Sequence, residues 1–413
     1  MNQQQLRTKV LVDCGAGDSE IAELLAYNQN VFDFSSVQLP QTFPPDPEPG
    51  VAAWEKYAAA AETMGVYQVL KKCLIQFQFP IVAGISETEE YRAATRKGKF
   101  PDESAMASRP ASYGIPLTFT EPEKLQLQLY QTLAGTIPVL IAANREDFVT
   151  LVQALTKRNE PQPISDSMGA CTISGYNNWH RIEQYKQQWS VRQNKYSETD
   201  WEAEFKRLIP RKELYQDRLI ILSTGPYSNV TASNLGLTET EWGQLSLKIR
   251  LEHESTHYFT RRFFGSMRNN MTDELIADYR GIVAALGYYR SDWFLHFIGL
   301  ESFPAYRKGG RLENYRGQPV LSDSAFKILQ ILVKKAAENL DRFDKQFCQH
   351  QRTPLEQLSA VVTLTALTLE ELADDSAEFL QKFAASANLT LGNMNSTKAL
   401  ANFNDVVGCV SLR

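Results

Sequence analysis

The residues with the clearest chemical potential lie in the segment LEHESTHYFT, residues 251–260. His253 and His257 are four residues apart, so on a helix their imidazoles lie one above the other and can bind one cation. Glu254 is rotated by about 100° from His253 around the helix axis. That rotation excludes Glu254 as a third ligand but leaves it near enough to accept a proton. The spacing therefore predicts a metal site, most often occupied by zinc, that lacks one protein ligand.

These residues must be carried by a largely buried helix. Thr238 followed by Glu241 forms a capping box, which predicts a helix that begins there and runs to about Phe264, with Gly265 as its stop. The two histidines continue an apolar stripe at spacings of four, formed by Leu245, Ile249, His253 and His257. Ionisable side chains on such a face are costly unless something compensates their charge.

The missing ligand is expected on the next helical segment, MTDELIADYRGIVAALGYY, which Thr272 can cap. Glu274 and Asp278 stand four residues apart on one face of this helix. Glu274 can bind the metal, while Asp278 can accept the remaining N–H of a ligand histidine and fix its tautomer. This arrangement leaves the fourth coordination position open for water.

The segment HESTH followed by ELIAD resembles the gluzincin group of zinc metallopeptidases, and the match covers residues 253–278. The resemblance implies zinc ligation by His253, His257 and Glu274, with Glu254 as general base and Asp278 supporting a histidine. It also implies one Zn²⁺ per chain, a zincin-like core made of a small sheet and two metal-binding helices, and a peptide or protein substrate. The expected function is a zinc-dependent hydrolase, a metallopeptidase that cleaves peptide bonds with zinc-activated water.

Such a reaction also needs a hydrogen-bond donor for the developing oxyanion. The polar segment AYRKGGRLENYRGQP follows the second metal helix and could fold over the cleft. Its Tyr306 and Tyr315 are the first candidates for catalytic donors, together with Arg316, and His296 is a further one.

The rest of the chain predicts a helix-rich α+β protein with three regions: residues 1–160, of mixed α/β character; 161–300, the catalytic domain; and 301–413, a helical domain. DRLIILS at 217–223 is the clearest strand, and IPVLIAA is a second. An extended substrate could pair with an edge strand, either in SMGACTISGYNN or in the strand that ends in STGPYSN.

The loop between the metal helices contains Arg261, Arg262 and Arg268, which could hold a substrate carboxylate. A solvated connector that only positions Glu274 is the favoured interpretation of this loop.

Composition limits the partners. The net charge is −5 and the basic residues are scattered among acids, which argues against nucleic acid. No apolar run approaches the roughly 20 residues that span a bilayer, and the N-terminus lacks the features of a secretory leader. Five cysteines without a CxxC pair fit a reduced compartment, so we expect a cytoplasmic protein.

Three alternatives stay open. A zincin-like protein could act as a catalytically idle scaffold, although Glu254 is present. VLVDCGAGDSEIAELL, with Gly15 and Gly17 after a strand-like run, faintly resembles a nucleotide-binding turn of a methyltransferase-like module. The C-terminal helices could bind a partner, but their apolar spacing is also that of a domain packed on the catalytic helices.

Overall fold

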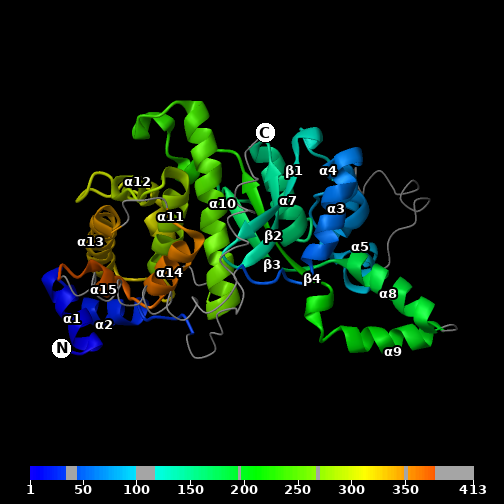
Figure 1. Cartoon of the computed structure of the whole chain (residues 1–413), viewed down its shortest axis with the longest axis horizontal. Helices are drawn as coiled ribbons and strands as arrows, with labels where there is room; N and C mark the ends of the chain where they lie inside the picture. The colour runs from blue at the N-terminus through cyan, green and yellow to red at the C-terminus, as the bar shows by residue number, and fades with distance from the viewer. Residues whose placement is uncertain (34–43, 99–116, 194–196, 267–269, 348–351, 377–413) are drawn as a thin grey trace. The chain divides into compact units, whose positions relative to one another are not determined.

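A computed structural model describes residues 1–33, 44–98, 117–193, 197–266, 270–347 and 352–376 (Figure 1). The described chain forms two compact units. We call them the sheet unit, residues 46–131 and 135–225, and the helical unit, which takes residues up to 45, 132–134 and those from 226 onward. The predicted boundaries after residues 160 and 300 do not coincide with these units, because the N-terminal helices belong with the C-terminal ones.

The sheet unit is built around four strands in the order β1-β2-β4-β3. Their bounds are β1 Gln126–Thr132, β2 Gly135–Ala142, β3 Ala170–Asn177 and β4 Gln216–Ser223. β2 and β4 pair in parallel, with Val139 opposite Ile220, and β3 pairs antiparallel to β4, with Cys171 opposite Ile221. Both predicted strands are therefore confirmed, as β4 and within β2.

The sheet order decides which strand could receive a substrate. β3, which contains most of SMGACTISGYNN, lies at an edge of the sheet as predicted. β4 lies between β2 and β3, so its backbone groups are already paired on both sides. The proposal that the strand ending in STGPYSN accepts a substrate strand was therefore wrong.

Helices complete this unit: those at residues 51–73 and 145–156 pack on the sheet, and those at 89–97, 179–193 and 198–208 share a second apolar cluster. They are α3 Val51–Met64, α4 Val66–Cys73, α5 Glu89–Lys97, α7 Arg145–Thr156, α8 Trp179–Gln193 and α9 Glu198–Leu208, with short 3-10 turns η1 Ile75–Gln78, η2 Ile85–Glu87, η4 Pro122–Lys124 and η5 Lys212–Leu214. Trp54 of α3 and Phe148 of α7 pack in one apolar cluster with Leu140 and Ile221 of the sheet. Burial of these large side chains supplies the main stabilisation of the unit.

The helical unit carries the predicted metal ligands. Its elements are α1 Gln3–Asp13, α2 Asp18–Tyr27, η6 Tyr227–Asn229, η7 Ala232–Leu235, α10 Glu239–Phe264, α11 Met271–Leu286, α12 Ser291–Ile298, η8 Arg311–Tyr315, α13 Asp323–Phe347, α14 Pro354–Thr365 and α15 Leu369–Ala373. Long helices together with one small sheet confirm the helix-rich α+β class. The sheet and the two metal helices nevertheless belong to different units.

α10 forms as its local chemistry predicts. Thr238 caps its first turn, the side chain of Glu241 returns to the Thr238 backbone N–H, and Gly265 ends the helix with a φ of +66°. Only glycine adopts that left-handed conformation without strain. α11 lies beside α10 in Figure 1, and the two helices pack along their length.

The start of α11 differs from the prediction by two residues. Asn270, not Thr272, is the N-cap, and its side chain accepts a hydrogen bond from the Asp273 backbone N–H at 3.0 Å. Asparagine caps helices as well as threonine does, so sequence alone left the choice between them open. Thr272 is instead buried inside the first turn.

The N-terminal residues do not form a strand. Residues 10–12, which carry the strand-like run, lie inside α1, and Gly15 follows the end of that helix. The turn between a strand and a helix that nucleotide binding would need is therefore absent from residues 3–27. In Figure 1, α1 and α2 lie beside α13 and α15, segments from the other end of the described chain.

Two further findings bear on the setting of the protein. Among the residues that the structure describes, no helix combines the length and the apolar character needed to cross a bilayer. Cys14, Cys73 and Cys171 are free thiols, whereas Cys348 and Cys409 lie outside the described residues.

Candidate metal centre

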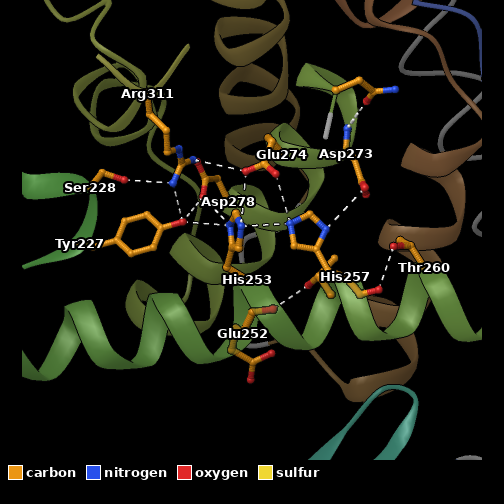
Figure 2. Close-up of polar contacts among 12 residues, drawn as sticks. Tyr227, Ser228, Glu252, His253, His257, Thr260, Asp273, Glu274, Asp278 and Arg311 are labelled. Atoms are coloured by element: carbon orange, nitrogen blue, oxygen red, sulfur yellow. Dashed lines mark hydrogen bonds and ion pairs between the residues drawn. The ribbon is translucent and has the colours of Figure 1, made fainter. Parts of the chain in front are cut away.

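His253, His257 and Glu274 converge at one buried point of the helical unit. One ligand atom from each lies within 4.8 Å of those of the other two. Figure 2 shows both imidazoles rising from α10 toward the carboxylate of Glu274 on α11. The three side chains leave at most 8 % of their surface exposed. The structure therefore brings together the three residues that the sequence proposed as ligands.

The distances between these donor atoms match those around a small metal ion. The Nε2 atoms of His253 and His257 are 3.1 Å apart, and each lies 3.4 Å from an oxygen of Glu274. Zinc bonds of about 2.0–2.1 Å in a tetrahedron place neighbouring ligand atoms about 3.3 Å apart. A zinc ion can thus be accommodated with little movement of these side chains.

The tautomer of His253 is fixed by its other ring nitrogen. Asp278 Oδ1 lies 2.8 Å from Nδ1 of His253, so the carboxylate accepts its N–H. Tyr227 lies beside them, and its hydroxyl donates to the same Asp278 oxygen at 2.5 Å. Nε2 of His253 is left with a free lone pair that faces His257 and Glu274. Asp278 therefore occupies the supporting position expected for it.

His257 has a second carboxylate on its far side. Asp273 Oδ2 lies 3.5 Å from Nδ1 of His257, an ion-pair distance. Among the described residues, neither Asp273 oxygen has a hydrogen-bond partner, and the same holds for Nδ1 of His257 and for Oε2 of Glu274. Buried polar atoms without partners are costly. Their presence around one point favours a site whose charge is completed by a bound cation.

Arg311 closes the other side of the cluster, opposite Asp273 in Figure 2. Its guanidinium pairs with Asp278 Oδ2 and donates to the Tyr227 hydroxyl at 2.8 Å. Burial alone would raise the pKa of Asp278, but Arg311 and His253 outweigh it and hold the pKa below its usual range. Asp278 is therefore a carboxylate at neutral pH. Burial raises the pKa of Tyr227 well above its usual value, so its hydroxyl stays protonated.

The charges of this buried group do not balance by themselves. Asp273, Glu274 and Asp278 contribute three negative charges, and Arg311 contributes one positive charge. With neutral histidines the net charge is −2, which is the charge that a divalent cation neutralises. Isolated buried charge is strongly unfavourable. The donor atoms, their spacing and the charge all fit zinc at this position.

The family model described as "Family of unknown function (DUF7005)" matches residues 9–376. The chain belongs to DUF7005. The match includes both units and every residue of the metal centre. No curated protein matches the chain, and no solved structure does. Membership in DUF7005 assigns no activity.

The remaining sequence candidates are placed differently in the DUF7005 chain. Glu254 follows His253 on α10 and is partly exposed, in contrast to the buried ligands. Tyr315, at the end of η8, is brought to the centre. Burial and the negative charge of the Glu274 carboxylate raise the pKa of Tyr315 well above its usual value.

The other donor candidates have local partners. The Tyr306 hydroxyl donates to the Gly310 carbonyl at 2.6 Å and accepts from the Glu313 backbone N–H at 3.0 Å. Arg316 pairs with Asp323 at 2.6 Å and donates to the Leu321 carbonyl. The carbonyl of His296 on α12 accepts from Arg307. The hydrogen bonds and ion pairs of these three residues therefore hold loops together and do not involve the metal ligands.

Of the arginines in the connector, Arg262 donates to the Ala134 carbonyl and lies 3.4 Å from the Tyr258 hydroxyl. Arg261 is partly buried in the last turn of α10, and Arg268 lies outside the described residues. The contact of Arg262 fits the connector interpretation better than a role in binding substrate.

Tyr227, Asp273 and Arg311 are the members of the centre that sequence reasoning missed. Asp273 had a signal, because it directly precedes the proposed ligand Glu274 in a helix's first turn. Tyr227 and Arg311 had none, since they are 26 residues before His253 and 33 residues after Asp278 and arrive through tertiary folding.

Proposed function

We propose that this chain is a zinc-dependent hydrolase that cleaves peptide bonds. The observation that carries the proposal is the pair of facing imidazole nitrogens, 3.1 Å apart, with Glu274 at 3.4 Å from each. Two imidazole nitrogens and a carboxylate that are buried and converge at these distances form the donor set of a three-ligand zinc site. The resemblance of residues 253–278 to gluzincins supports the choice of zinc and of peptide hydrolysis.

In this proposal each side chain has one task. His253, His257 and Glu274 hold the ion, while Asp278 and Asp273 orient the two imidazoles through their Nδ1 atoms. When bound, zinc supplies a Lewis acid that polarises a carbonyl group and lowers the pKa of water. Glu254 takes the proton of the attacking water and passes it to the leaving amine.

Tyr315 is the proposed donor to the oxyanion. Its hydroxyl stays protonated, because burial and the Glu274 carboxylate raise its pKa. Glu254, Tyr315 and Arg311 are partly exposed, whereas the metal ligands are buried. A zincin-like architecture is proposed only for the helix pair, since the sheet belongs to the other unit.

Metal analysis of the purified protein tests the first half of the proposal. We expect one zinc per chain in the parent and in Glu254→Gln, and loss of zinc from His253→Ala and Glu274→Ala. His180→Ala is a matched control, since His180 contacts Tyr57 in the sheet unit. It should retain the metal. Full zinc content in both ligand variants would contradict the assignment.

Hydrolysis tests the second half. The parent and Glu254→Gln are incubated with a mixture of short peptides, and new termini are detected by mass spectrometry. We expect cleavage by the parent only, because glutamine cannot accept the proton. Equal metal content with no cleavage by either protein would identify a metal-binding scaffold and refute the hydrolase.

A further inference from the structure

The segment of residues 27–33, which begins with the last residue of α2, contacts α10, α11 and η8, three of the elements that carry the metal centre. Its first residue is Tyr27, whose hydroxyl donates to the Tyr315 carbonyl at 2.5 Å. The same hydroxyl accepts from the Met271 backbone N–H at 3.2 Å. Met271 begins α11, one turn before the ligand Glu274, and Tyr315 ends η8. One hydroxyl therefore connects the start of α11 to η8.

The ring of Tyr27 also fixes the chain just beyond η8. Gly317 has a φ of +80°, and a Cβ built on it would lie 2.8 Å from the Tyr27 ring. No other residue fits there without displacing the ring or the chain. Tyr27 thus contacts η8 through a hydrogen bond and the chain just beyond it through close packing.

The other end of the segment reaches the end of α10. The Asp33 backbone N–H donates to the Phe264 carbonyl at 3.0 Å, which satisfies one of the carbonyls left open at the helix end. The buried ring of Phe32 packs edge-on against Phe264, with centroids 6.1 Å apart. Phe264 is the last residue of the helix that carries His253 and His257.

The segment is anchored independently of these contacts. Arg7 of α1 forms a buried ion pair with Glu370 of α15 at 3.2 Å, and Asn28 donates to the same carboxylate at 3.1 Å. Asn30 donates to the Thr365 carbonyl at the end of α14. Residues 27–33 are therefore held by a rigid support outside the metal centre, as a positioning element requires.

We propose that residues 27–33 are a clamp that sets the spacing between the end of α10, the start of α11 and η8, with Tyr27 as its main positioning residue. The proposal rests on the metal centre of the proposed function. It adds a role for an N-terminal segment more than 200 residues away in sequence from the ligands, a segment that no metal-binding motif contains.

Cobalt(II) titration tests the clamp, because the visible spectrum of bound cobalt reports ligand geometry. Tyr27→Phe keeps the ring but removes both hydrogen bonds. We expect it to weaken Co²⁺ binding about tenfold, the lower end of the effect of residues that orient ligands. We also expect a shifted cobalt absorption band. Phe32→Leu is a second variant, which weakens the contact with α10. It should also weaken Co²⁺ binding and shift the cobalt absorption band.

Two controls separate the clamp from general stability. Tyr67→Phe removes a similar hydrogen bond, to the Leu117 carbonyl at 2.6 Å in the sheet unit. Tyr176→Phe removes another tyrosine hydrogen bond of the sheet unit, to Gln76 Oε1 at 2.6 Å. Both should keep the affinity and spectrum of the parent. If Tyr27→Phe and Phe32→Leu bind cobalt with the affinity and spectrum of the parent, the clamp is refuted. If the parent protein binds no metal, the proposed function is refuted instead.

Discussion

Gly281 of α11 packs so closely on Ile249 of α10 that a Cβ built on the glycine would lie 2.8 Å from the Ile249 carbonyl oxygen. The obstacle is backbone, so it cannot turn aside as a side chain would. Ile249 lies one turn before His253, and Gly281 lies about one turn after Asp278. The absence of a side chain at residue 281 therefore lets the two metal helices approach each other.

We expect Gly281→Ala to separate the helices and to weaken both stability and metal binding. Overpacking costs about 1–3 kcal/mol, and the better helix propensity of alanine returns about 1 kcal/mol, so a net loss of up to about 2 kcal/mol is expected. Denaturant unfolding of the metal-free protein and zinc titration measure the two effects. Gly243→Ala on α10 is the control, because a Cβ there meets nothing within 4 Å. It should be neutral or stabilising.

Asp278→Asn tests whether the carboxylate of Asp278 orients His253 for metal binding. Asparagine keeps the shape but removes the charge that faces Arg311 and can present an N–H to His253. Loss of such a partner typically lowers metal affinity 10–100-fold. Asp217→Asn is the matched control, since Asp217 is equally buried and pairs with Arg181 in the sheet unit. Calorimetry should show lower stability for both variants and weaker zinc binding for Asp278→Asn alone.

The variants Tyr315→Phe and Tyr306→Phe test which of the two candidate tyrosines donates a hydrogen bond to the oxyanion. The charge of Glu274 acts on the Tyr315 hydroxyl, whereas the hydroxyl of Tyr306 is hydrogen-bonded to the backbone of its own loop. With a cleaved peptide as substrate, we expect Tyr315→Phe to lower kcat on the order of a hundredfold at unchanged zinc content. Tyr306→Phe should retain most of the parental kcat. The reverse order of effects would transfer the role to Tyr306.

Local chemistry made part of this centre predictable. The bounds of α10 follow from Thr238, Glu241 and Gly265, three residues whose effects on a helix extend only over neighbouring residues. The supporting role of Asp278 follows from its spacing of four from Glu274 on one helix. In both cases a short stretch of sequence contains all the groups that interact.

Tertiary contacts decided the rest. The run of residues 10–12 favours a strand by its β-branched valines, yet it lies inside the helix α1. Arg7 of the same helix pairs with Glu370, which comes from the far end of the described chain. Arg311 follows no pattern relative to Asp278, and its position depends on how the chain after α12 folds back. Such pairs cannot be read from periodicity, because nothing in either segment specifies the other.

The protonation of His257 predicts how pH acts on the metal-free protein. Burial alone would lower its pKa, but the carboxylates of Asp273 and Glu274 outweigh burial and raise the pKa well above 6.5. A histidine whose pKa is higher in the folded than in the unfolded protein stabilises the fold when it is protonated. This stabilisation is complete at a pH below the unfolded-state pKa and is lost as the pH rises through the folded-state pKa. At about pH 6, the free energy of unfolding of the metal-free parent should therefore be larger than that of the metal-free His257→Gln variant. This difference should become smaller toward about pH 9.

Zinc must displace the same proton, so apparent affinity should fall as the pH decreases, by up to about tenfold per pH unit for one displaced proton. Glu274 and Asp278 do not take up protons in the pH range of this experiment. Their lowered pKa values give stability that is lost only as the pH falls below their unfolded values of 4.5 and 3.8. Zinc titrations at several pH values measure the slope, with His180→Ala as the control that keeps it. A zinc affinity independent of pH between about pH 6 and 8 would show that no proton is displaced and that His257 is already neutral.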